Sequence, residues 1–166
     1  MSINKWEPPG TWGPVTGGLM TQTSTGTTFS IVAESPATFN AAGYAALTYV
    51  EVGEVTDIAE IGSETAKVEH KPLKTGIVEK FKGFRDFGSS SVSFAKSATD
   101  AGQILLASGA DGANINKQHS VCITLQDGTK MYFVCKVFSF KTAPGSADSI
   151  VGSTSSIEIE SVIVEV

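Results

Sequence analysis

The sequence predicts a mainly β protein, a β-sandwich or small barrel with one flanking α-helix and long loops. Residues 120–141, SVCITLQDGTKMYFVCKVFSFK, contain two apolar runs separated by Asp127-Gly128, a dipeptide that favours a tight hairpin turn. Other short runs rich in β-branched and aromatic residues alternate with stretches of Gly, Pro and Ser, as in all-β proteins. Residues 99–108 are the one clear helix candidate, because a capping residue precedes a Leu-rich run.

The central hairpin at residues 120–141 has apolar side chains on both of its faces. A type I′ turn at Asp127-Gly128 sets the expected register. The expected facing pairs are Gln126 with Thr129, Ile123 with Tyr132 and Val121 with Val134. A sheet with one wet face would instead alternate apolar and polar residues. We therefore expect a second sheet or a helix over one face, and a helix or a neighbouring subunit over the other.

The two cysteines, Cys122 and Cys135, fall on the two strands of this hairpin. In the expected register they are diagonal neighbours, roughly 7–8 Å apart. That separation is too large for an easy disulfide, so we predict two reduced and buried thiols.

Length and charge restrict the function classes. The 166 residues suffice for one domain with a core, and the formal net charge is −5. No cluster of Lys and Arg suggests tight binding to nucleic acid phosphates, and no run is long enough to span a membrane. Residues 1–14 lack the pattern of a secretory signal, so we expect assembly in the cytosol.

Residues 1–26 are expected to be a flexible N-terminal arm, followed by a single domain over residues 27–166. Three prolines and many glycines exclude a helix in this arm. Trp6 and Trp12 are unusual in a disordered tail, which favours an arm that docks on a partner surface.

The first half of the domain is predicted to contain two strands and a long loop. Residues 27–33 and 47–55 read as strands, the second interrupted at Gly53. Residues 57–74 are mixed in charge and weakly patterned. A loop of this length has a function or is disordered.

The second half adds three strands around the helix and the central hairpin. Residues 76–83 and 89–97 read as strands on either side of a turn at Arg85-Asp86. Thr99 or Asp100 caps the helix. Residues 142–154 form a loop before the last strand, 155–166, in which a change of phase indicates a β-bulge.

The sequence contains no recognisable catalytic or metal-binding pattern, so we predict no enzyme activity and no cofactor or metal. His70 and His119 occur in separate contexts, and Cys122 sits in mid-strand, a poor place for a nucleophile. Glu158 and Glu160 are more typical of a solvated strand face than of an acid–base pair. The apolar hairpin, the N-terminal arm and the long loop instead indicate self-association.

Residues 83–112, GFRDFGSSSVSFAKSATDAGQILLASGADG, resemble the tail tube (major tail) proteins of long-tailed, non-contractile bacteriophages. The match lies in a Gly-flanked strand, the helix start with Asp100, Gly102 and Gln103, and the Leu-rich helix. Residues 47–58 resemble the second strand of that family, and the order of elements is similar over residues 27–166.

The resemblance implies a tail-tube-like fold and a structural protein of the virion tail. Copies of such proteins form stacked, usually hexameric, rings around a lumen through which DNA leaves the capsid without specific binding. Partners would be other copies of the chain and, by resemblance, the tape measure, tail terminator and distal tail proteins, with no membrane. The implied subunit and ring-stacking contacts are Trp6, Trp12, Ile61, Val68 and Leu73. Glu158 and Glu160 are the candidate lumen residues.

Two other readings of the sequence remain open. A stand-alone sandwich that binds carbohydrate or mediates adhesion would expose aromatic residues in a groove and stay monomeric. A tube protein of the type VI secretion kind is similar at the level of the fold. A hydrolase with an unrecognised site has no support in the sequence.

Overall fold

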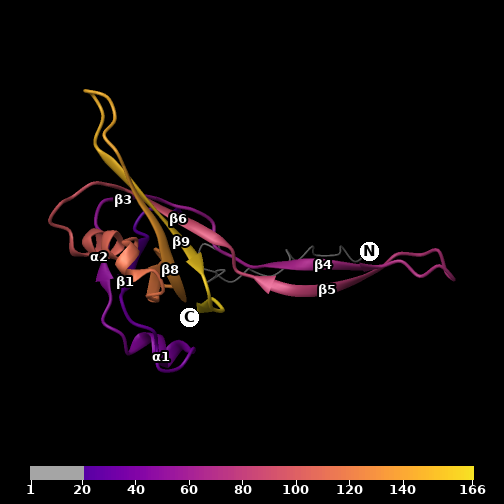
Figure 1. The fold of residues 1–166 in the computed structure, drawn as a ribbon. Helices are drawn as coiled ribbons and strands as arrows, with labels where there is room; N and C mark the ends of the chain where they lie inside the picture. The colour runs from indigo at the N-terminus through magenta and orange to yellow at the C-terminus, as the bar shows by residue number, and fades with distance from the viewer. Residues whose placement is uncertain (1–20) are drawn as a thin grey trace, which may run out of the picture.

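The structure, a computed structural model, describes residues 21–166 and is mainly β with two α-helices (Figure 1). The strands are β1 Thr28–Val32, β2 Val50–Glu51, β3 Val55–Ile58, β4 Glu64–His70, β5 Glu79–Asp86, β6 Ser89–Ala95, β7 His119–Thr124, β8 Lys130–Ala143, β9 Gly152–Ile159 and β10 Val164–Glu165. The helices are α1 Ala41–Ala45, α2 Ala101–Gly109 and a 3-10 turn, η1, at Gly112–Asn114. The prediction of a mainly β fold with a flanking helix is confirmed.

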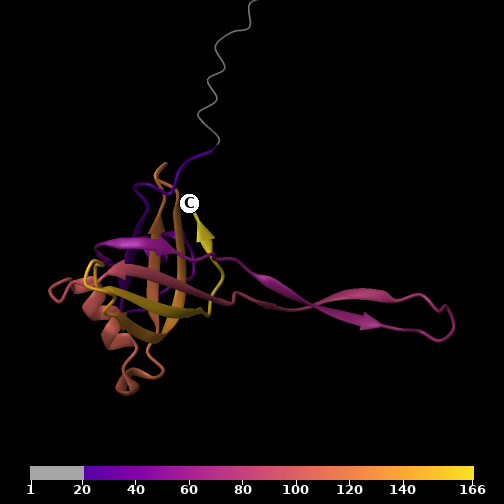
Figure 2. The same ribbon diagram turned by 90° about the horizontal axis from the view of Figure 1, so that it is seen from above.

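One antiparallel sheet of eight strands forms the body of the described chain. Its order is β2-β1-β7-β8-β9-β6-β3, with β10 paired to β8. The two edge strands, β2 and β3, are consecutive in the chain and are joined by residues 52–54 alone, so the sheet must curl back on itself (Figure 2). In the described residues β2 and β3 do not pair with each other. The sheet is therefore strongly curved, but no hydrogen bonds between its two edge strands close it into a barrel.

The main core lies on the concave side of this sheet under α2. Its buried members come from β1, β6, β7, β8, β9 and α2 and include Phe29, Ile31, Val92, Phe94, Leu106, Val121, Phe133 and Ile157. The 14-residue β8 is shared, because it pairs with β7 in its first half and with β9 in its second half. A register shift between Val137 and Ser139 leaves Phe138 64% exposed and returns Phe140 to the core.

The turn of the central hairpin differs from the expected type I′ turn, and that prediction is wrong. Gly128 N–H donates to the Leu125 carbonyl (3.0 Å), and Leu125 N–H donates to the Thr129 carbonyl (2.8 Å). The loop therefore has three residues, of which Gly128 alone has a positive φ, +91°. Asp127 stabilises this loop, because its Oδ1 accepts the Thr129 N–H at 2.9 Å.

The longer loop shifts the register by one residue, so the expected facing pairs are also wrong. Val121 faces Phe133 and Cys122 faces Tyr132. A one-residue shift moves every side chain of one strand to the other face relative to its partner. Cys122 and Cys135 consequently lie on opposite faces of the sheet, although both are free and buried as predicted.

The second face of the hairpin is covered by α1 and the C-terminal segment of the same chain. This cluster consists of Tyr44, Cys122, Tyr132 and Val134, with Tyr49 and Val164 against it. Asn40 caps the start of α1, because its Oδ1 accepts the Gly43 N–H at 2.9 Å. The buried Tyr44 ring stacks on the Tyr132 ring, with their centroids 5.5 Å apart. The protomer thus buries both faces itself. The hairpin gives no reason for self-association, contrary to the expectation from sequence.

Several boundaries also differ from the predicted ones. The strand expected at residues 47–55 is divided into β2 and β3 by a turn in which Glu54 has a φ of +57°. The expected turn at Arg85-Asp86 is absent, because β5 continues to Asp86. The phase change near the C-terminus is a strand end rather than a bulge: β9 stops at Ile159, and Val164 then pairs with Tyr132 of β8.

Candidate functional site: an exposed hairpin arm and a hydroxyl face

The segment expected to be a long loop is largely a two-stranded hairpin that projects from the body (Figures 1 and 2). We call β4, β5 and the connection between them the hairpin arm. Every residue of β4 is exposed, as is every residue of β5 except the half-buried Gly83. An isolated two-stranded hairpin is marginally stable in water. The contacts within the hairpin arm therefore stabilise it only marginally.

The hairpin arm has an apolar side and a basic side. Val68 pairs with Phe81, and both are more than half exposed. The adjacent pair, Lys67 with Lys82, points to the other side because side chains alternate along a strand. Leu73, Ile77, Val78 and Phe84 are further exposed apolar residues of the same segment. This amphipathic character resembles that of an interface more than that of a solvated loop.

A second surface, which we call the hydroxyl face, covers the side of β6, β9 and β8 opposite the core. It consists of the outward residues Ser89, Ser91, Ser93, Thr154, Ser156, Glu158, Lys136, Ser139 and Lys141. Hydroxyl pairs bridge the strands, with Ser93 to Thr154 at 3.1 Å and Ser139 to Ser156 at 2.7 Å. The face is polar, and its charged residues are Lys136, Lys141 and Glu158.

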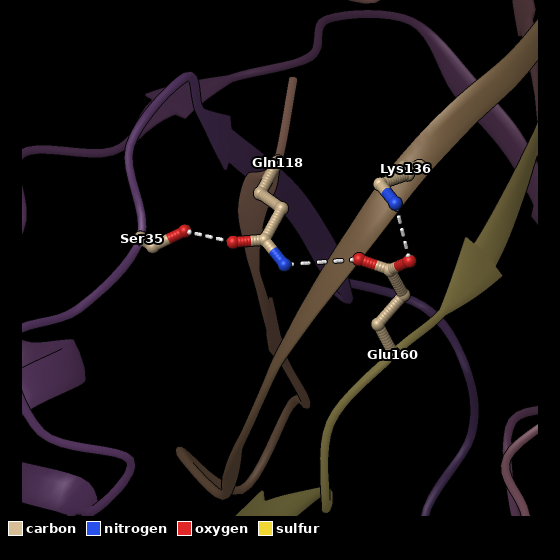
Figure 3. A network of polar contacts seen from close by, with 4 residues as sticks. All are labelled: Ser35, Gln118, Lys136 and Glu160. Carbon is tan, nitrogen blue, oxygen red and sulfur yellow. Dashed lines mark hydrogen bonds and ion pairs between the residues drawn. The ribbon is translucent and has the colours of Figure 1, made fainter. Parts of the chain in front are cut away.

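A four-residue polar network fixes one end of the hydroxyl face (Figure 3). The Lys136 ammonium lies 2.7 Å from Glu160 Oε1, and Gln118 Nε2 donates to Glu160 Oε2 at 3.0 Å. Gln118 Oε1 accepts the Ser35 hydroxyl at 2.9 Å, which joins four separate segments. The hydrogen bond from Lys136 lowers the pKa of Glu160, so the carboxylate and its ion pair persist at neutral pH.

The titratable groups of the described residues do not converge on one point. His119 is buried beside Gly109, where burial lowers its pKa, while His70 is exposed on the hairpin arm. In residues 21–166 no group of three His, Cys, Asp or Glu side chains is arranged to hold a metal ion. Neither helix in this range has the length and apolarity needed to cross a membrane.

The predicted contact residues lie in three separate places. Val68 lies on β4, and Leu73 lies at the fully exposed end of the hairpin arm. Ile61 precedes β4 and packs against the core. Trp6 and Trp12 lie outside the described residues. Glu158 belongs to the hydroxyl face, and Glu160 to the network at its end.

Sequence reasoning assigned no function to the hydroxyl face or to the basic side of the hairpin arm. Alternating serines at residues 89, 91 and 93 carried the signal for the first. The alternation of Lys80 and Lys82 with Phe81 carried the signal for the second, but its partner strand could not be recognised in residues 57–74.

Comparison with solved structures places this arrangement among tail proteins. The chain superposes on a protein in the 6-fold symmetrised baseplate of the anti-feeding prophage with a TM-score of 0.65 at 7% identity, covering 90% of this chain and 97% of that one. A protein in the C6-symmetric tail of an empty GTA particle gives a TM-score of 0.58 at 13% identity, covering 86% and 97%. Superposition on the SPP1 tail tube protein gives a TM-score of 0.52 at 14% identity, covering 84% of this chain and 75% of that one.

The chain has the tail-tube fold. At these identities the likeness concerns the fold, and it agrees with the resemblance seen in residues 83–112. In sequence, no family model and no curated protein matches the chain.

Proposed function

We propose that this protein is a structural subunit of a phage tail that self-assembles into stacked, hexameric rings and so forms the tail tube for DNA ejection. The similar proteins come from a 6-fold baseplate, a C6 tail and a tail tube, which supports a ring of six. A head-to-tail interface that rotates by one sixth of a turn closes into such a ring. The protein then resides in the virion tail and assembles in the cytoplasm of the bacterial host.

The observation that carries this proposal is the uncovered hairpin arm. Leu73 is fully exposed and Phe84 is 93% exposed, while the body buries its own core completely. A soluble monomer has little use for a long apolar projection, whereas a subunit that reaches its neighbour requires one. Val68 and Leu73 are accordingly the contacts we assign to ring stacking, with Ile61 at the base.

The hydroxyl face is our candidate for the wall of the lumen, with Glu158 on it and Glu160 at its end. A conduit for DNA must not retain phosphates, and a basic wall would do so. On this face Lys136 is neutralised by its ion pair with Glu160. The other two charges of the face, Lys141 and Glu158, are opposite in sign, and its hydroxyl groups offer weak and exchangeable contacts to a passing polyanion.

Other tail components complete the proposal. The two ends of such a tube require partners, and by resemblance these are the tape measure, tail terminator and distal tail proteins. We assign residues 1–26, with Trp6 and Trp12, to an arm that braces neighbouring copies.

Electron microscopy of the purified protein tests the proposal. We expect rings or hollow tubes from the complete chain. A variant in which residues 64–86 are replaced by a short Gly-Ser linker should keep the circular dichroism of the body and remain monomeric. A complete chain that stays monomeric up to millimolar concentration would contradict the proposal and favour a stand-alone binding module.

A further inference from the structure

The charges of the described chain are divided between two segments of opposite sign. The hairpin arm, residues 64–86, contains six of the twelve basic residues of the chain and four acidic ones, so its net charge is +2. Residues 51–60, at the sheet edge formed by β2 and β3, contain four acidic residues and no basic one. A chain with a net charge of −5 therefore has one projection with a net positive charge and one negative edge.

The acidic edge borders an apolar hollow of about 290 Å³ at the base of the hairpin arm. The apolar residues that line it are Val55, Ile58, Ile61, Ile123, Leu125 and Met131. Asp57 and Glu60 also line it, and both are exposed. Within residues 21–166 neither carboxylate has a cation within ion-pair distance.

The hairpin arm has the complementary pattern. Val68 and Phe81 form its apolar side, and Lys80 and Lys82 flank Phe81 in β5 and belong to the other side. In the described chain neither of these two lysines has a carboxylate within ion-pair distance, whereas Lys67 is paired with Glu69 at 2.7 Å. Lys80 and Lys82 point to the opposite side of this two-stranded ribbon from Phe81, but their long side chains can reach around its edge to carboxylates at the rim of an apolar hollow.

The hairpin arm cannot fill the hollow of its own chain, because it extends away from the body (Figures 1 and 2). We propose that the hairpin arm of one copy docks on the hollow of the next copy, with Phe81 on the apolar floor and Lys80 and Lys82 near Asp57 and Glu60. This inference rests on the proposed tube function and names the surface that receives the arm. The contact is head-to-tail, so each copy is at once donor and acceptor.

Charge reversal on each side provides the test. The donor variant is Lys80→Glu with Lys82→Glu, and the acceptor variant is Asp57→Lys with Glu60→Lys. Each variant alone places like charges opposite each other. We expect the critical concentration for assembly, measured by light scattering, to rise about tenfold in each. The matched control, Lys117→Glu with Lys130→Glu, changes the net charge as much as the donor variant at exposed sites away from the hairpin arm and should assemble as wild type.

Mixing the two inactive variants is the decisive experiment. The reversed arm of the donor variant complements the reversed edge of the acceptor variant, and the two unchanged surfaces complement each other as well. An equimolar mixture should therefore assemble near the wild-type concentration, which a misfolded variant could not do. If the single variants assemble normally, or if the mixture fails to assemble, the docking proposal is wrong. The proposed tube function would still stand in that case, provided that the wild-type chain forms tubes. A wild-type chain that never assembles would overturn both.

Discussion

Gly102 of α2 lies directly against the backbone of Val52: a β-carbon added at Gly102 would come within 2.7 Å of the Val52 Cα. This approach brings the start of α2 onto the turn that joins the two edge strands of the sheet. Asp100 Oδ2 accepts the Gly53 N–H at 3.1 Å, and Gln103 Nε2 donates to the Gly53 carbonyl at 3.2 Å. The helix start thereby fixes the connection between β2 and β3.

Gly102→Ala should destabilise the protein although alanine is the better helix former. The helix propensity gain is about 1 kcal/mol. The contact with Val52 requires the helix to move, and overpacking of this kind costs about 1–3 kcal/mol. We expect a net loss in the free energy of unfolding in urea. Gly112→Ala is the control, since open space surrounds Gly112, and it should be neutral. A stabilised Gly102→Ala would contradict the close approach.

Gln103→Ala should destabilise the protein by about 2–3 kcal/mol, because buried polar groups lose their partners. Gln103 is 2% exposed, and its amide accepts the Ser97 N–H (2.8 Å) and donates to the Ala95 carbonyl (2.9 Å). Thermal unfolding followed by circular dichroism measures the loss. The exposed Gln126→Ala has no buried partner and should change stability by less than about 0.5 kcal/mol.

Two tyrosines of the second cluster, Tyr44 and Tyr49, should respond to substitution by phenylalanine in opposite directions. The Tyr44 hydroxyl lies 3.2 Å from Ser161 Oγ, whereas the Tyr49 hydroxyl is buried without a hydrogen-bond partner in the described chain. Tyr44→Phe should lower the free energy of unfolding by about 1 kcal/mol. Tyr49→Phe should raise it by about 0.5 kcal/mol, because it removes a buried hydroxyl group that has no partner. Each variant serves as the control for the other. Equal losses in both would show that Tyr49 has a partner.

Glu160→Gln should destabilise the protein at neutral pH and lose this effect in acid. The pKa of Glu160 is lowered, chiefly by Lys136, so its stabilisation is present above the ordinary value of 4.5 and disappears as pH falls through the folded-state pKa. The partly exposed ion pair suggests a difference of about 0.5–1 kcal/mol at pH 7. Urea titrations at pH 7 and pH 3 measure it. The exposed Glu165→Gln should show no such pH dependence, and a constant difference for Glu160→Gln would contradict the ion pair.

Local chemistry explains which elements could be predicted from sequence. α2 follows from its cap, because Asp100 Oδ1 accepts the Gln103 N–H at 2.8 Å as the pattern requires. The register of the central hairpin could not be predicted, because Asp-Gly occurs in two-residue and three-residue loops alike. The choice between them depends on Thr129 and on Gln22, which accepts the Asp127 N–H at 2.9 Å from the start of the described chain.

The candidate site shows the same limit. β4 has hardly any apolar residues, and its strand character comes from pairing with β5. Val68 and Leu73, which the family resemblance implies as contacts, lie on the hairpin arm, and their role as contacts stays a prediction. The hydroxyl face was missed because serine has no strong preference for strands and reveals itself only when β6 and β9 lie side by side.

The edge strand β3 has a consequence for copies that have not yet assembled. It is four residues long, its pairing with β6 is irregular between Val55 and Asp57, and it presents a carboxylate. Short, irregular and charged edges are poor templates for indiscriminate strand addition. The β3 edge therefore disfavours growth of this chain into fibrils.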